Sequence, residues 1–242
     1  MRKLSEVARV GCQFSFTCAG LAVGLIVVSS AQAQEKSVRP GINDSFREPV
    51  AKEFVERFEI ESREVFAKRK EIVETLKLKK GSTIGDIGAG TGLFTRLFSE
   101  AVGPDGQVMA VDIAQNFLDH ITRTSRETGR RNIHTVLCTP ESTNLMENSL
   151  DVAFICDSYH HFEFPLKTMR SLQAALKPNG RVFVIDFKRI EGQTSEWTMN
   201  HVRAGQEVFE QEILSCGFRK VAENKDTLKD NYFLEFAKAD VR

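Results

Sequence analysis

Short apolar segments alternate with helix-like segments along most of this sequence, and this rhythm constrains the fold more than any other feature. The apolar runs predict strands, and between them apolar residues recur at helical spacing. Strands that alternate with helices of about ten residues are typical of βαβ units in a parallel sheet covered on both faces. We expect strands at 83–87, 107–113, 133–138, 151–156, 181–187, 218–222 and 232–237, and helices at 93–101, 114–128 and 166–176 with a further one ending near 216.

The sequence before this alternation predicts additional helices. Val50, Phe54 and Phe58 recur at the spacing of one helix face, and a second helical pattern covers 62–76. We therefore predict an α/β protein with a Rossmann-like, doubly wound, mostly parallel seven-stranded sheet and N-terminal helices. The expected organisation is a flexible leader at 34–48 and one domain at 49–242, whose residues 49–80 form a helical cap.

The first 33 residues have the features of a secretory signal peptide. Positive residues precede a charge-free apolar run at 14–28, and Ala31-Gln32-Ala33 matches the small-x-small cleavage pattern. We expect cleavage after Ala33, export to the periplasm or the medium, and no stable membrane insertion afterwards. The alternative is an uncleaved membrane anchor, although the apolar run is shorter than the ~20 residues of a spanning helix.

Charge and cysteine content exclude several classes of function. The 33 basic and 33 acidic residues balance, which gives no electrostatic footprint for nucleic acid or an anionic membrane surface. Beyond the expected signal peptide only Cys138, Cys156 and Cys216 remain, widely spaced and without a CxxC pair. The cysteines therefore indicate neither a disulfide framework nor a zinc site, and nothing in the sequence sets the oligomeric state.

A glycine cluster, GDIGAGTG at 85–92, lies between the first expected strand and the first expected helix. Glycines at such a corner allow a sharp turn and the close approach of a ligand. Asp112 ends the second expected strand, twenty residues after Gly92, where an acidic side chain can bind both ribose hydroxyls of a nucleotide. The dinucleotide fingerprint requires glycine where Leu93 stands, and this disfavours a nicotinamide cofactor.

Taken together, the motifs at 86–92, Asp112, 151–162 and 176–180 resemble those of class I S-adenosylmethionine-dependent methyltransferases, in the type 11, UbiE-like branch. The resemblance covers roughly residues 60–240 and implies the class I methyltransferase fold with S-adenosylmethionine as the cofactor. It implies that Asp112 binds the ribose and that Ile113 contacts the adenine. It also places Thr139 and Glu141 where relatives use an aspartate to bind the adenine amino group. The residues that it places against the amino acid portion of the cofactor are Asp86, Gly88, Ala89, Gly90 and Gly92.

The candidate catalytic residues follow the fourth expected strand. Asp157, His160 and His161 lie where the end of a strand borders the ligand crevice of a doubly wound sheet, and each side chain can accept a proton from an acceptor oxygen or nitrogen. The competing interpretation is that the two histidines are hydrogen-bonded structural residues. Asp186, Trp197, His201 and Arg203 are second candidates.

Three functions fit this sequence. The first is transfer of a methyl group from S-adenosylmethionine to a small-molecule acceptor, a reaction that needs alignment of the reacting atoms and no metal. The second is a non-catalytic ligand-binding protein of the same fold. The third, an NAD(P)-dependent oxidoreductase, is disfavoured by Leu93.

Overall fold

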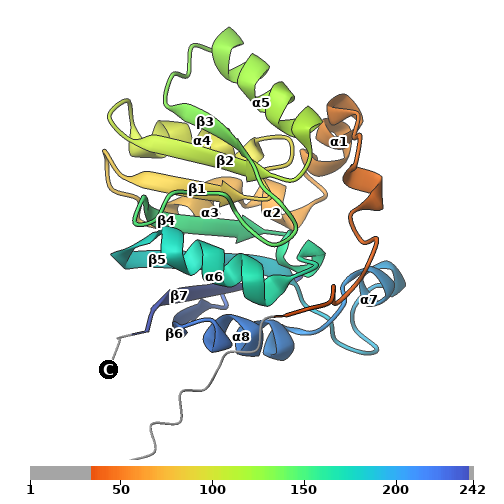
Figure 1. Cartoon of the computed structure of the whole chain (residues 1–242). Helices are drawn as coiled ribbons and strands as arrows, with labels where there is room; N and C mark the ends of the chain where they lie inside the picture. Colours follow the sequence, from red (N-terminus) through yellow and green to blue (C-terminus); the bar gives the residue numbers. More distant parts are fainter. Residues whose placement is uncertain (1–33, 240–242) are drawn as a thin grey trace, which may run out of the picture. The chain divides into compact units, whose positions relative to one another are not determined.

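A computed structural model describes residues 34–239, and the expected signal peptide lies outside this described part. The sheet has seven strands in the order β3-β2-β1-β4-β5-β7-β6 (Figure 1). The first five strands are parallel, while β7 runs antiparallel to both β5 and β6. The predicted mostly parallel, doubly wound sheet is therefore confirmed. The strands are β1 (Thr83–Ile87), β2 (Gln107–Asp112), β3 (Ile133–Leu137), β4 (Leu150–Cys156), β5 (Leu176–Phe187), β6 (Phe218–Asn224) and β7 (Asn231–Lys238).

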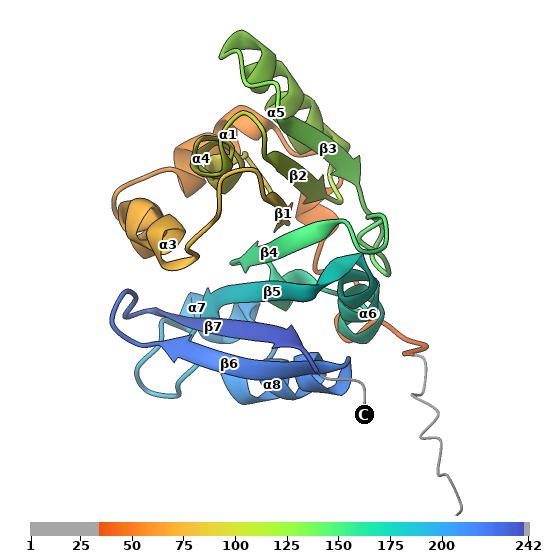
Figure 2. The ribbon, with the colours of Figure 1, turned by 90° about the vertical axis from the view of Figure 1, so that its left-hand side faces the viewer.

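Helices cover both faces of the sheet, and the central strands are accordingly apolar on both sides. On β4, Val152 and Phe154 pack toward α3 and α4, whereas Ala153 and Ile155 pack toward α6 and α8. Figure 2 shows α3 and α4 on one side of the sheet and α6 on the other. The α-helices are α1 (Ala51–Phe58), α2 (Glu64–Ala67), α3 (Arg69–Thr75), α4 (Leu93–Val102), α5 (Gln115–Glu127), α6 (Pro165–Ala175), α7 (Glu196–His201) and α8 (Gln206–Ser215), with 3₁₀ turns η1 (Asp44–Phe46) and η2 (Tyr159–His161).

The segment expected to be a flexible leader is instead packed against the domain. The Val38 N–H donates to the Glu163 carbonyl at 2.9 Å, and the Arg39 guanidinium donates to the carbonyls of Asn200 and His201. Phe46 packs on Phe54 in α1. Figure 1 shows this segment running beside the sheet from near α7 to α1. Polar composition does not reveal these distant partners.

Three other elements differ from the expected ones. The single helix at 62–76 is two helices, α2 and α3, which meet at Lys68. The turn at 177–180 lies inside β5 as an irregularity, since pairing with β4 passes from Leu176 directly to Arg181. Between β5 and the helix ending near 216, where no element was expected, the structure has the short helix α7. No helix among residues 34–239 has both the length and the apolar character needed to cross a membrane.

Candidate active site

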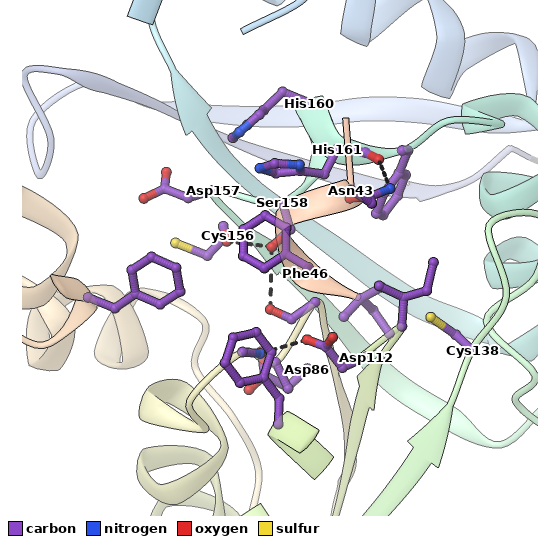
Figure 3. A pocket seen from close by; sticks show the side chains of 18 of the residues that line it. Asn43, Phe46, Asp86, Asp112, Cys138, Cys156, Asp157, Ser158, His160 and His161 are labelled. Atoms are coloured by element: carbon purple, nitrogen blue, oxygen red, sulfur yellow. Dashed lines mark hydrogen bonds between the residues drawn. The ribbon is translucent and has the colours of Figure 1, made fainter. Parts of the chain in front are cut away.

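A cavity of about 670 Å³ lies where β1, β2, β4 and β5 end. Its wall combines the glycine turn after β1 with the segment after β4, and residues from the N-terminal segment, α1 and α7 complete it. In Figure 3, His160 and His161 lie at one end and Asp86 and Asp112 at the other, with Ser158 between them. The predicted site residues that line the cavity are Asp86, Gly88, Ala89, Gly90, Asp112, Ile113, Thr139, Asp157, His160 and His161.

The turn after β1 needs glycine for reasons of space as well as conformation. Gly88 has φ of 76°, and a Cβ placed there would lie 2.4 Å from the Ser158 hydroxyl oxygen. Gly92 has φ of 79°, and its Cβ would lie 2.8 Å from Ile121 in α5. Gly92 does not line the cavity, so its role is to let α4 begin close to α5. The backbone at Gly88 is thus brought close to the end of β4.

Asp112 is held at the end of β2 by backbone donors. One carboxylate oxygen accepts the Gly90 N–H at 2.8 Å, and the other accepts the Ala114 N–H at 2.9 Å. Each oxygen has a second lone pair, so the carboxylate retains the capacity to accept hydrogen bonds from two ribose hydroxyls. Burial raises the pKa of Asp112, since its side chain is almost fully removed from solvent.

Asp86 is the second buried acid of this half of the cavity. It is 4% exposed, and Thr95 Oγ1 donates a hydrogen bond to it at 2.5 Å. Burial raises the pKa of Asp86 from its ordinary value of 3.8 to about 7, despite the opposing hydrogen bond from Thr95. A cationic ligand group beside this carboxyl would favour its charged form. The amino acid portion of S-adenosylmethionine carries such a group.

Thr139 and Glu141, expected near the adenine, are separated by the structure. Thr139 lines the cavity together with Cys138 and Pro140. Glu141 does not line it, because its carboxylate is exposed and forms an ion pair with Lys167 at 2.9 Å. The geometry therefore supports Thr139 and gives Glu141 no contact with the cavity.

Asp157 is held by other side chains, one at each carboxylate oxygen. Its carboxylate accepts hydrogen bonds from Arg63 at 2.5 Å and from Asn231 at 2.6 Å. Burial raises the pKa of Asp157 to about 6, while the Arg63 guanidinium opposes this shift. Asp157 also has φ of 49°, a strained conformation for a residue other than glycine. These contacts tie the start of α2 to β4 and β7, so Asp157 is suited to positioning the site.

The two adjacent histidines have different surroundings. His160 is 2% exposed, and its Nδ1 lies 2.7 Å from an oxygen of Asp186, whose other oxygen accepts the His160 backbone N–H at 3.0 Å. The His161 Nε2 lies 3.3 Å from the His201 Nε2. Burial, with the neighbouring His160 and His201, lowers the pKa of His161 to about 2, so this imidazole is neutral at physiological pH.

Several residues of the cavity wall come from segments that are distant in the sequence. His201, a second candidate, lies directly against His161, and Asp186 fixes His160. Phe46 was not predicted at all, yet it lines the cavity and meets His161 edge-on at 5.1 Å between ring centroids. No periodicity in the sequence distinguishes this lone aromatic residue within a polar segment.

Comparisons with known proteins agree with this geometry. Residues 85–184 match the family model described as a methyltransferase domain. The ubiquinone/menaquinone biosynthesis C-methyltransferase UbiE of Pasteurella multocida is 32% identical over 117 residues, which cover 46% of this chain and 42% of that protein. The protein of the same name from Klebsiella pneumoniae strain 342 is 31% identical over 113 residues, covering 46% and 45%. The chain thus spans less than half the length of these curated relatives.

Solved structures share the fold at low sequence identity. A SAM-dependent methyltransferase from Aquifex aeolicus has a TM-score of 0.68 at 22% identity, and the match covers 76% of this chain and 96% of that one. The [4+2]-cyclase SpnF has a TM-score of 0.61 at 17% identity, covering 72% and 81%. Residues 85–184 thus match a methyltransferase domain, and the chain has the class I methyltransferase fold, which it shares with the SAM-dependent methyltransferase from Aquifex aeolicus.

Proposed function

We propose that this protein transfers a methyl group from S-adenosylmethionine to a small-molecule acceptor bound in the cavity. The observation that carries the proposal is the composition of its wall. The glycine turn and Asp112 are suited to a nucleoside, and the histidines at the end of β4 border the same space. A volume of about 670 Å³ falls within the range of small-molecule sites, about 300–1,000 Å³.

Each half of the cavity has a distinct task in this proposal. Asp112 accepts hydrogen bonds from the ribose hydroxyls, and the Asp86 carboxyl stabilises the positive end of the cofactor. S-adenosylmethionine supplies an electrophilic methyl group on its sulfonium sulfur. The protein then has to align an acceptor atom with that methyl, roughly 3 Å away.

His161 is the best placed group to accept a proton from the acceptor. Its neutral imidazole lines the cavity and contacts His201. With a pKa of about 2 it is a weak base, so it can take up a proton only if the proton passes on through His201 to the more exposed end of the site. Asp186 holds His160, and Arg63 holds Asp157. We therefore assign His160 and Asp157 to positioning the site. Phe46, Phe187 and Trp197 border the histidines, which favours an apolar or aromatic acceptor with an ionisable oxygen or nitrogen.

The test is turnover with a panel of such acceptors. We expect the full chain to form S-adenosylhomocysteine together with a product heavier by one methyl group, detected by mass spectrometry. His161→Ala should reduce turnover by ~10²–10⁴-fold, and His120→Ala, which removes an imidazole from α5, should not. Cofactor binding without product from any acceptor would favour the ligand-binding alternative, and binding of NAD in its place would favour an oxidoreductase.

We also propose that the protein is exported, on the basis of the basic residues, apolar run and Ala-Gln-Ala sequence at its N-terminus. Fractionation of producing cells and mass spectrometry of the N-terminus test this. A product beginning at Gln34 outside the cytoplasm is expected. An intact Met1 on the cytoplasmic protein would contradict the proposal. Export also requires that S-adenosylmethionine reach the same compartment.

A further inference from the structure

Three histidines from two separate segments meet on the wall of the cavity. His160 and His161 belong to η2, and His201 ends α7. One ring nitrogen from each of the three lies within 4.8 Å of the other two. The sequence holds five histidines in all, so the fold gathers most of them at one point.

The orientation of the cluster is fixed by its surroundings. Asp186 holds Nδ1 of His160, which leaves Nε2 as the free nitrogen of that ring. A carboxylate that binds the second nitrogen of a histidine is the usual partner of a metal-ligating imidazole. Trp197 stacks on His201 with 4.6 Å between ring centroids, and Phe46 packs edge-on against His161.

The separations suit a tetrahedral ion. Two nitrogens that each lie 2.0–2.1 Å from a tetrahedral zinc ion are about 3.4 Å apart, and the His161 and His201 Nε2 atoms lie 3.3 Å apart. A hydrogen bond between two neutral imidazoles would give a similar distance. It would not account for the third ring, a nitrogen of which also lies within 4.8 Å of the other two.

We propose that His160, His161 and His201 together bind one divalent transition-metal ion of the zinc class. Three histidines leave one coordination position for water or substrate, as in catalytic zinc sites, and the cavity supplies the space for it. The sequence does not predict this site, because only two of the three ligands are neighbours in the chain. Asp186 offsets part of the charge of the ion, and the Arg39 guanidinium at the His201 carbonyl opposes it.

A metal ion here would change the class of acceptor, and this step rests on the proposed methyl transfer. The ion would occupy ring nitrogens of His161 and His201, so the ion would take over from His161 the activation of the acceptor. A hydroxyl or thiol that binds the ion loses its proton to solvent. The lone pair on that oxygen or sulfur then forms the bond to the methyl carbon as the bond from this carbon to the sulfonium sulfur breaks. The expected acceptors are therefore phenols and thiols.

Metal binding is tested first without cofactor. The full chain is freed of metal with a chelator and titrated with Zn²⁺ by calorimetry and with Co²⁺ by visible absorption. We expect one site per chain and the intense absorption of tetrahedral Co²⁺. His201→Ala and His161→Ala should lose this site. His134→Ala, which removes an exposed imidazole from β3, should retain it.

Two controls separate the possible failures. Circular dichroism establishes that each variant is folded, and His201→Ala is the safer of the two single substitutions because the His201 ring is less buried than that of His161. If the wild type binds no more Zn²⁺ than the His161→Ala/His201→Ala double variant, the metal proposal is wrong. Binding of S-adenosylmethionine by the metal-free protein is measured separately. A negative result for metal binding therefore leaves the methyltransferase proposal to be tested by itself.

Discussion

At the scale of single residues, the site depends on two buried acids and a glycine. Asp86 is the clearest case, because its carboxyl is removed from water and has only the Thr95 hydroxyl as a side-chain donor. The raised pKa means that the folded state retains a proton that the unfolded state releases between pH 4 and 7. The free energy of unfolding therefore falls as the pH rises through this window.

Asp86→Asn should remove this pH dependence. The variant keeps an oxygen that can accept the Thr95 hydroxyl but carries no charge to desolvate. Relative to the wild type, it should gain stability from pH 4 to 7, by roughly 1.4 kcal/mol for each unit by which the pKa of Asp86 is raised. Denaturant unfolding at several pH values measures this. Parallel curves for the two proteins would show that Asp86 titrates normally.

A comparison of Gly88→Ala with Gly129→Ala distinguishes the cost of backbone strain from the cost of a steric clash. The added Cβ would meet the Ser158 hydroxyl, whereas at Gly129, with φ of 70°, nothing lies within 4 Å of an added Cβ. Gly129→Ala should thus cost only the left-handed conformation, about 1–2 kcal/mol. Gly88→Ala should cost more and should weaken cofactor binding. Equal losses of stability in the two variants would mean that the segment after β4 moves away from the added Cβ at no cost in stability.

At the scale of elements, the N-terminal segment forms part of the cavity wall. Phe46 in η1 packs on Phe54 and Phe117 and also reaches His161. The sequence predicts α1 from its apolar spacing, but it does not show that the preceding segment crosses to α7. Likewise, the apolar spacing does not show the break at Lys68, nor that Glu64 at the start of α2 accepts the backbone N–H groups of Lys229 and Asp230.

Phe46→Ala should weaken this wall. We expect a loss of roughly 1–2 kcal/mol in stability, below the 3–5 kcal/mol of a fully buried phenylalanine because Phe46 is partly exposed. Trypsin should then cleave more quickly after Arg47. Val38→Ala, an exposed position in the same segment, is the matched control. Unchanged proteolysis in Phe46→Ala would show that the Arg39 and Asn43 hydrogen bonds hold the segment without it.

At the scale of the whole molecule, the sequence predicts one half of the site much better than the other. The residues of the cofactor half are close together in the sequence, because β1, the glycine turn and the end of β2 lie within thirty residues. The spacing of these residues therefore predicts how they are arranged in space. The acceptor half joins the N-terminal segment, the end of β4 and α7, and only the fold brings these together. The strands themselves were predicted to within a few residues at most ends, because burial on both faces makes them continuously apolar.

The central claim is that the cavity binds S-adenosylmethionine through Asp112, and calorimetric titration tests it most directly. The full chain should bind the cofactor, and Asp112→Ala should lose about 1–3 kcal/mol of binding free energy with the ribose hydrogen bonds. Asp112→Asn, which preserves the shape, serves as a check on folding, and Asp119→Ala, an exposed acid on α5, should bind as the wild type does. Equal affinity in the wild type and Asp112→Ala, or no binding by the wild type, would contradict the account.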